Sequence, residues 1–317
     1  MALIVTGTIG IDTVYTPTGH AERVLGGSCT YFAAAASFFA PVRLVAAVGD
    51  DFPKEHRAVL EHFKGIDLAG LETRQGSKTF AWGGKYLANM NSRETLFTEL
   101  GVLAEHPPRV PESFAHSRHV FLANTHPAVQ LGMIEQLPHR VLTVADTMDL
   151  WINIAKPELL MLLKKIDGIV LNYDEAELLT GKSNPVTAGR HILDLGPSFV
   201  VIKKGEHGAL LVHRDGSAHG TLGFGLAALP AYPTEKVVDP TGAGDTFAGG
   251  MMGYLSSTGS TDAKKLTSYA SIRTALAFGT VAASFNIESY SLERLKTLKR
   301  SEIDQRLREY EEMTRIG

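Results

Sequence analysis

The distribution of apolar residues predicts that strands and helices alternate along most of the chain. Short apolar runs rich in β-branched residues, which are typical of buried strands, are separated by stretches with helical periodicity. Because such alternation forms βαβ units, the pattern predicts a doubly wound α/β core with a mostly parallel sheet. Strands are expected at 2–6, 42–48, 119–122, 141–145, 168–171 and 199–203. Helices are expected near 28–39, 52–63, 128–137, 157–165, 174–180, 185–194, after 243, at 262–284 and at 291–313. A hairpin is expected from 209–213 with 217–222.

One region departs from this alternation. Residues 78–89 and 94–99 alternate polar with apolar side chains, contain aromatic residues and are joined by a polar turn, which predicts an antiparallel hairpin outside the main sheet. We expect a small β appendage built from about 12–24 and 76–103, on a single α/β domain that spans 1–317.

Composition narrows the class of protein. The chain has 317 residues, 44% hydrophobic and 21% charged, which is ample for a large globular core. A net charge of −3 does not favour a nucleic-acid or acidic-membrane partner. The single cysteine, Cys29, excludes an internal disulfide and is compatible with a reducing compartment. Since no signal peptide or membrane-length apolar run is evident, we expect a soluble, cytoplasmic protein.

The most informative segment is the glycine-rich stretch 239–250, Asp-Pro-Thr-Gly-Ala-Gly-Asp-Thr-Phe-Ala-Gly-Gly. Gly242 and Gly244 allow backbone conformations that other residues disfavour, and the small apolar residues that follow predict a helix. The N-terminus of a helix favours a bound anion. A carboxylate at that place, Asp245, could take a proton from a hydroxyl that attacks a bound phosphoryl group. The structural alternative is that Asp245 caps a buried helix.

This segment resembles the signature of the PfkB/ribokinase family of sugar and nucleoside kinases. Four other segments, in the order usual in that family, share the resemblance. Residues 26–35 resemble the paired-glycine substrate loop with its helix, and 42–51 the strand and Val-Gly-Asp-Asp turn that follow. Residues 172–175 have the Asn-x-x-Glu spacing, and 201–208 resemble the strand and glycine turn that line the nucleotide.

The resemblance implies a ribokinase-like fold and an ATP-dependent phosphotransferase. The γ-phosphoryl group of ATP would pass to a hydroxymethyl group of a sugar or nucleoside, with Asp245 as the base. The backbone of Gly242, Ala243 and Gly244 would form the anion hole. The β appendage would be a lid over the sugar; in some members of the family it pairs with a second subunit, so a homodimer through the lid is expected here.

The resemblance also implies residues that hold the nucleotide and magnesium. Asn172 and Glu175 would order Mg²⁺ around the phosphates, Glu175 mostly through water. Lys203, Gly205 and Gly208 would line ATP. The structural alternative for Asn172 and Glu175 is a helix N-cap with its capping-box partner. The structural alternative is a solvated strand end for Lys203 and a simple turn for Gly205 and Gly208.

A monovalent cation site is a further implication. Asp239 and Thr241 match positions that bind such a cation in several family members, and Ser291 could add an oxygen, so K⁺ is a candidate cofactor. The alternative is ordinary turn chemistry, because Asp and Thr side chains bond well to backbone in turns. The late loop 284–291 lacks the glycine that often accompanies such a site.

For the acceptor, the resemblance points to Asp12, Gly26, Gly27 and Asp146. A carboxylate such as Asp12 can bind two adjacent hydroxyls, which suits a sugar diol. The chain departs from the family at Tyr31, where an asparagine is common. Tyr31 either turns into the core or stacks on a ring of the substrate.

We expect these residues to meet in one crevice. Asp12, the paired glycines 26–27, Asp146, Asn172 and Asp245 each follow a predicted strand, and ligands of open α/β sheets bind beyond the carboxyl ends of strands.

Two other functions agree less well with the sequence. A NAD-dependent oxidoreductase would need an early Gly-x-Gly-x-x-Gly, which residues 7–10 do not form. A non-catalytic sugar or nucleotide sensor would have lost the base or the anion hole, and both are present. The sequence leaves open whether the acceptor is a free sugar or a nucleoside.

Overall fold

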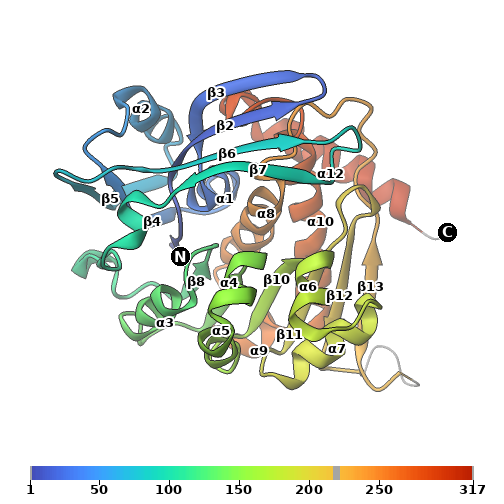
Figure 1. The fold of residues 1–317 in the computed structure, drawn as a ribbon. Coiled ribbons are helices and arrows are strands. Elements are labelled where there is room, and N and C mark those ends of the chain that lie inside the picture. Colours follow the sequence, from blue (N-terminus) through green and yellow to red (C-terminus); the bar gives the residue numbers. More distant parts are fainter. Residues whose placement is uncertain (1, 217–221, 316–317) are drawn as a thin grey trace.

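The computed structural model describes residues 2–216 and 222–315, which form two β-sheets and the helices around them (Figure 1). The larger sheet has nine described strands in the order β13-β12-β11-β10-β9-β8-β1-β4-β5. The smaller sheet has four, in the order β3-β2-β6-β7. The larger sheet contains β1 (Leu3–Thr6), β4 (Val42–Gly49), β5 (Ile66–Arg74), β8 (His119–Leu122), β9 (Leu142–Asp146), β10 (Gly168–Asn172), β11 (Phe199–Lys203), β12 (Ala209–His213) and β13 (Gly225–Leu229).

Helices cover both faces of the larger sheet. In β1, Leu3 and Val5 pack into one hydrophobic cluster with α1, α8 and α10, whereas Ile4 packs into another with α3, α5, α6 and α7. This alternation explains why the core strands are apolar throughout. The helices are α1 (Ser28–Ala36), α2 (Lys54–His62), α3 (Pro127–Glu135), α4 (Asp149–Ile154), α5 (Lys156–Leu163), α6 (Tyr173–Thr180), α7 (Pro185–Asp194), α8 (Ala243–Ser257), α9 (Ala263–Leu266), α10 (Tyr269–Asn286), α11 (Glu293–Thr297) and α12 (Arg300–Thr314).

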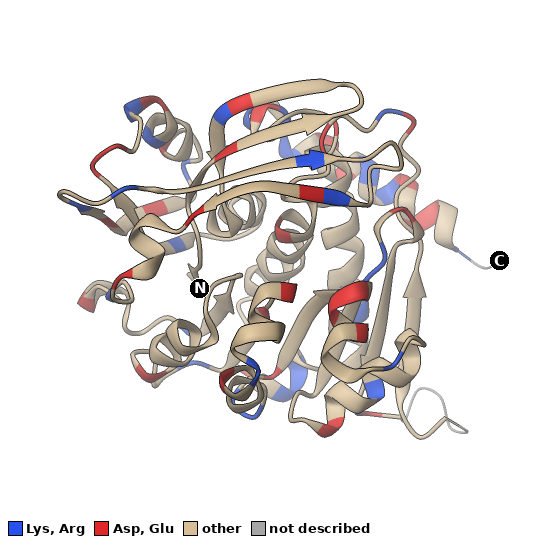
Figure 2. Ribbon diagram, viewed as in Figure 1, with Lys and Arg blue, Asp and Glu red and all other residues tan. Residues whose placement is uncertain are grey.

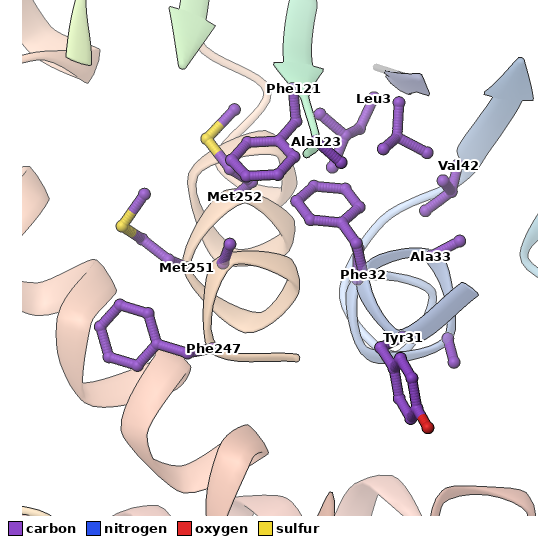
Figure 3. Close-up of a cluster of buried hydrophobic side chains, with 14 of the residues drawn as sticks. Leu3, Tyr31, Phe32, Ala33, Val42, Phe121, Ala123, Phe247, Met251 and Met252 are labelled. Carbon is purple, nitrogen blue, oxygen red and sulfur yellow. The ribbon is translucent and has the colours of Figure 1, made fainter. Parts of the chain in front are cut away.

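The small residues of α8 let this helix lie close to its neighbours. A Cβ atom added to Gly249 would lie 2.4 Å from the carbonyl oxygen of Phe32 in α1. One added to Gly250 would lie 2.7 Å from that of Phe278 in α10. Figure 3 shows the apolar side of this contact, where the Phe32 and Phe121 rings stack at 4.2 Å beside Met252. This packing fixes the position of the N-terminus of α8.

The four-stranded sheet is the predicted appendage and forms a lid sheet over one end of the core (Figure 1). Its strands are β2 (Gly10–Thr16), β3 (Gly19–Gly26), β6 (Phe80–Tyr86) and β7 (Arg93–Glu99). β6 and β7 pair antiparallel, which confirms the predicted hairpin. β6 also pairs parallel to β2, so segments far apart in sequence share the lid.

The structure corrects several boundaries. The stretch 262–284 is two helices, because the side chain of Ser268 caps a new helix, α10, by accepting from the Ser271 N–H. The stretch 291–313 is also two helices, α11 and α12. β5 and α4 were not predicted; β5 is a partly exposed edge strand, and α4 has only six residues. β12 pairs antiparallel with β11 and β13, and residues 217–221 of the predicted partner strand 217–222 lie outside the described residues.

One correction concerns the site. Asp12 was expected to follow a strand, at the start of the appendage; it lies in the appendage, but within strand β2, paired with Trp82 of β6. The lid sheet itself therefore carries a candidate acceptor contact. None of the helices given above combines the length and apolarity that a membrane crossing requires.

Candidate active site

A cleft of about 1360 Å³ lies between the lid sheet and the carboxyl ends of the core strands. The residues predicted from the sequence that line it are Asp146, Asn172, Glu175, Lys203, Gly205, Gly208, Gly242, Ala243, Gly244 and Asp245. The lid adds Tyr86 and Arg93, which the sequence did not single out as site residues. The sequence indicated them only indirectly, as an aromatic residue and a basic residue at the two ends of the hairpin turn.

The glycine-rich segment forms a tight turn at the start of α8, and we call residues 239–245 the anion turn. Gly242 is the N-cap, with φ of 74°, and Asp245 is the third residue of the helix, so Asp245 is not the N-cap. The N–H of Ala243 donates to Pro240 O at 3.1 Å. The N–H groups of Gly244 and Asp245 have no acceptor within the helix, because they belong to its first turn. These two N–H groups are therefore available to bind an anion.

Acidic groups crowd the cleft around one buried lysine. Lys203 Nζ lies 3.9 Å from Asp146 Oδ2. A Cβ atom on Gly244 would lie 2.8 Å from the same Nζ, so Lys203 reaches the anion turn because Gly244 has no side chain. Burial alone would lower the pKa of Lys203, but Asp146, Glu175 and Asp245 together raise it. Lys203 therefore stays charged. Figure 2 shows acidic segments at the lid-facing ends of α4, α6 and α8.

Two of these acids have strongly raised pKa values. Burial and then the charge of Asp146 raise the pKa of Asp245 to about 8, against the opposing effect of Lys203. The same two causes raise the pKa of Glu175 to about 7. A carboxyl group with a pKa near neutrality is suited to accept a proton during turnover.

Asn172 and Glu175 form a complete capping box at the start of α6. Asn172 Oδ1 accepts from the Glu175 N–H at 2.8 Å, and Glu175 Oε2 accepts from the Asn172 N–H at 2.7 Å. The structural alternative is thus confirmed, and both residues also line the cleft. Their oxygens, with those of Asp146, are the hard donors that Mg²⁺ prefers.

The turn after β11 lines the far part of the cleft. Gly205 and Gly208 have φ of 56° and 83°. A Cβ atom on Gly208 would lie 2.0 Å from Leu229 O, so this glycine is needed for the approach of β13. The lid touches the turn, since Asn91 Nδ2 donates to Glu206 Oε1 at 2.9 Å.

The candidate cation residues lie behind the anion turn. Asp239 Oδ1 accepts from the Thr241 N–H at 2.8 Å, which confirms turn chemistry for that oxygen. Asp239 Oδ2 is buried and has no hydrogen-bond partner in the described part of the chain. Ser291 has φ of 51°, a left-handed conformation that favours glycine. An orphaned carboxylate oxygen beside a strained serine fits a bound cation.

Of the candidate acceptor residues, Asp146 lines the cleft, whereas Asp12, Gly26 and Gly27 lie outside its lining, in the lid strands β2 and β3 and at the start of α1. A Cβ atom on Gly26 would lie 1.9 Å from Asp12 Oδ2, so Gly26 makes room for this carboxylate. Gly27 has φ of 94° and caps α1. Burial and then the charge of Asp239 raise the pKa of Asp12 to about 7.

Tyr31 turns into the protein. It is 1% exposed, and its ring occupies the space where a Cβ atom of Gly242 would stand, at 2.3 Å from Cγ. Figure 3 shows the ring directed from α1 away from Phe32 and Phe121. Its hydroxyl is buried without a hydrogen-bond partner among the described residues.

Comparison with known proteins shows the family to which the chain belongs. The chain matches the pfkB family carbohydrate kinases over residues 15–297. It is 30% identical over 259 residues to a cytidine kinase of Thermococcus kodakarensis, covering 80% of this chain and 88% of that protein.

Solved structures show the same fold. A Burkholderia thailandensis nucleoside kinase in complex with inosine superposes with a TM-score of 0.72 at 19% identity, covering 97% of this chain and 98% of that one. A ribokinase-like protein of Escherichia coli in complex with ATP and Mg²⁺ superposes with a TM-score of 0.73 at 17% identity, covering 97% and 99%. The chain therefore belongs to the PfkB family of carbohydrate kinases and is an ATP-dependent kinase of a sugar or a nucleoside.

Proposed function

We propose that the protein transfers the γ-phosphoryl group of ATP to the hydroxymethyl group of a nucleoside. The observation that carries the reaction is the meeting of Asp245, the anion turn and Lys203 at one end of the cleft. The similarity to a cytidine kinase over most of both chains favours a nucleoside over a free sugar as acceptor.

Asp245 is the general base in this proposal. As the hydroxyl oxygen of the acceptor attacks the γ-phosphorus, its proton passes to the Asp245 carboxylate. The bond from phosphorus to the oxygen that bridges the β- and γ-phosphates breaks, and ADP leaves with that oxygen. The backbone of Gly242, Ala243 and Gly244, with Lys203, stabilises the charge on the transferring group.

The remaining residues hold the reactants. Asp12, Gly26 and Gly27 contact the acceptor from the lid side, with Asp146 opposite and Tyr31 behind. Lys203, Gly205 and Gly208 line ATP.

Bound ions complete the site. Asn172 and Glu175 would hold Mg²⁺, Glu175 through water, and the ion would neutralise charge on the phosphates. Asp239, Thr241 and Ser291 would hold K⁺, beside the Asp239 oxygen that has no hydrogen-bond partner among the described residues.

A non-catalytic sensor is the weaker alternative. Such a protein has no need of a buried base, yet Asp245 stands in the cleft with a pKa of about 8. Keeping a carboxylate beside other acids costs stability, and a cost of this kind is typical of active sites.

We further propose a single domain, 1–317, with a lid of about 12–24 and 76–103, that pairs with a second copy through the lid. β7 is an edge strand with every residue exposed. Four exposed apolar side chains lie within it or close to its ends in sequence: Leu87, Leu96, Phe97 and Leu100. An exposed edge strand that carries apolar side chains favours a partner. Sedimentation velocity should show a dimer that Leu96→Glu weakens; a wild-type monomer at all concentrations contradicts this pairing.

The reaction is tested by ADP release from ATP with a panel of nucleosides, free sugars and sugar acids. We expect a nucleoside to give the highest kcat/KM. A free sugar that is preferred would overturn the acceptor assignment, and no release with any acceptor would overturn the reaction.

A further inference from the structure

Hydrogen bonds from the lid converge on the two loops behind the acceptor site. These loops are residues 238–242, within and just before the anion turn, and residues 287–291, which follow α10. Thr18 Oγ1 donates to Val238 O at 3.2 Å. Thr16 Oγ1 and the hydroxyl of Tyr290 lie 2.8 Å apart. Ser291 Oγ donates to Leu25 O in β3 at 2.5 Å. The lid is thus bonded to both loops.

Tyr86 adds a contact to the anion turn itself. It is the last residue of β6 and is only 7% exposed, although Lys85 and Leu87 on either side are exposed. The side chain is buried because it enters the cleft, where its hydroxyl lies 3.3 Å from Thr241 Oγ1. A lid residue therefore touches the residue next to the N-cap of α8.

Thr241 makes three hydrogen bonds, two with residues of the core and one with a residue of the lid. Its N–H donates to Asp239 Oδ1, and its carbonyl oxygen accepts from Asn286 Nδ2 at 2.8 Å. Both of these partners belong to the core. The third bond, through Oγ1, reaches Tyr86, and it is the bond that opening the lid would break.

Tyr31 supports the same turn from the opposite side. Its ring packs on Gly242, the residue after Thr241. The turn is thus held between a tyrosine of α1 and a tyrosine of the lid. Because the tyrosine of α1 is rigidly packed, the hydrogen bond to the tyrosine of the lid determines the position of the anion turn.

We propose that Tyr86 is a positioning residue for phosphoryl transfer: through Thr241 it sets the anion turn only when the lid is closed over an acceptor. Closure and completion of the anion hole become one event. This couples catalysis to acceptor binding, and it limits the transfer of the phosphoryl group to water. The inference rests on the proposed role of the anion turn.

Tyr86→Phe tests the proposal, because it removes the hydroxyl and keeps the ring. With the acceptor that the wild type phosphorylates fastest, kcat should fall about five- to tenfold, the effect of one lost hydrogen bond, while KM for ATP changes less than about twofold. The ratio of ATP hydrolysis to transfer should rise. The matched control is Tyr15→Phe, another lid tyrosine, whose hydroxyl donates to exposed Glu22; all three quantities should stay unchanged.

A double-mutant cycle with Thr241→Val separates positioning from a structural effect. If Tyr86 acts through Thr241, Tyr86→Phe should cost nothing further in the Thr241→Val background. An unchanged kcat in Tyr86→Phe, or an equal loss in both backgrounds, would overturn the proposal. The acceptor in these assays is the one that the wild type phosphorylates fastest. If it is a free sugar, the nucleoside assignment is wrong, but the effect of Tyr86→Phe can still be compared between the two backgrounds.

Discussion

The two halves of the proposed site, one for the nucleotide and one for the acceptor, differ in how open they are. The nucleotide half is a wide cleft lined by the carboxyl ends of β9, β10 and β11 and by the turn after β11. The acceptor half is closed: Asp12 is 4% and Tyr31 1% exposed. The nucleotide half is built mainly by the core, with Tyr86 and Arg93 of the lid in its lining, whereas the lid supplies β2 and β3 to the acceptor half. This difference indicates that ATP meets a preformed surface and that the acceptor must displace the lid to enter.

Asp245 stands where the two halves meet. It lines the open cleft, and its pKa responds both to Asp146 and Glu175 on one side and to Asp12 on the other. A base at that junction can reach an acceptor hydroxyl only when both halves are filled. The predictions below test this division, in order of the size of the expected effect.

The largest effect is expected for Asp245→Asn. Loss of a general base should lower kcat by about 10²–10⁴-fold, with the KM values for ATP and acceptor within a few-fold, because the amide keeps the shape but cannot take the proton. Steady-state and single-turnover kinetics measure it. Asp174→Asn, an exposed acid at the rim of the cleft, is the control and should be nearly neutral. Turnover near that of the wild type in Asp245→Asn would remove Asp245 from the mechanism.

The same variant provides a check of folding. The pKa of Asp245 is raised from 3.8 to about 8, so the folded state binds the proton more tightly than the unfolded state. The ionised group therefore lowers the free energy of unfolding progressively as the pH rises from about 4 to 8. Asp245→Asn should raise Tm by a few degrees at pH 8 and hardly at all at pH 4. A lower Tm at pH 8 would mean that the amide disturbs the turn.

The second effect concerns the lid. Replacing residues 80–98 by a short linker should raise KM for the acceptor by about one to two orders of magnitude and increase ATP hydrolysis relative to transfer, because closure excludes water. KM for ATP should change little, since the nucleotide half belongs to the core. Circular dichroism reports whether the core stays folded. Transfer as efficient as that of the intact protein contradicts the lid assignment, and an unfolded variant contradicts the domain division.

The third effect is a pH dependence. Asp12 and Asp245 must be ionised to bind and deprotonate the acceptor, and their pKa values are raised to about 7 and about 8. The value of kcat/KM for the acceptor should therefore rise about tenfold per pH unit between about pH 7 and 8, and more steeply, approaching about a hundredfold per unit, below pH 7, where both groups are protonated. In Asp245→Asn the residual activity should lose the step near pH 8. A flat profile between pH 6 and 9 contradicts the proposed base.

The smallest effect is activation by a monovalent cation. K⁺ should raise kcat several-fold over a large organic cation, because a bound ion compensates Asp239 behind the anion turn. Asp239→Asn should abolish the difference between the two salts. Equal rates of the wild type in both salts would remove the cation site. Magnesium is a separate requirement, and full activity in excess chelator would contradict it.

Much of the fold follows from local patterns. The apolar runs with helices between them predicted the core, and the alternation at 78–99 predicted the hairpin of the lid, because each depends on residues close in sequence. The anion turn was equally local, since two glycines and an aspartate within seven residues define it. The edge strand β5 was missed because half of its residues are polar or exposed.

The rest of the site depends on contacts between distant segments. Asp12 was expected to follow a strand at the start of the appendage, but it lies within strand β2, which pairs with β6 about 70 residues further along the chain. The choice between the two orientations of Tyr31 could not be made without Gly242, against which the ring packs. The bond between Tyr86 and Thr241 spans 155 positions and leaves no pattern in either segment.

The most direct test of the central claim is the position of phosphate on the product. The proton-coupled ³¹P spectrum of the nucleoside product should be a triplet, because a phosphate on a hydroxymethyl group couples to two protons, and the signal should be absent with Asp245→Asn. A doublet would place the phosphate on a ring hydroxyl, and a triplet of equal intensity with Asp245→Asn would show transfer without the proposed base. Either result would contradict the account.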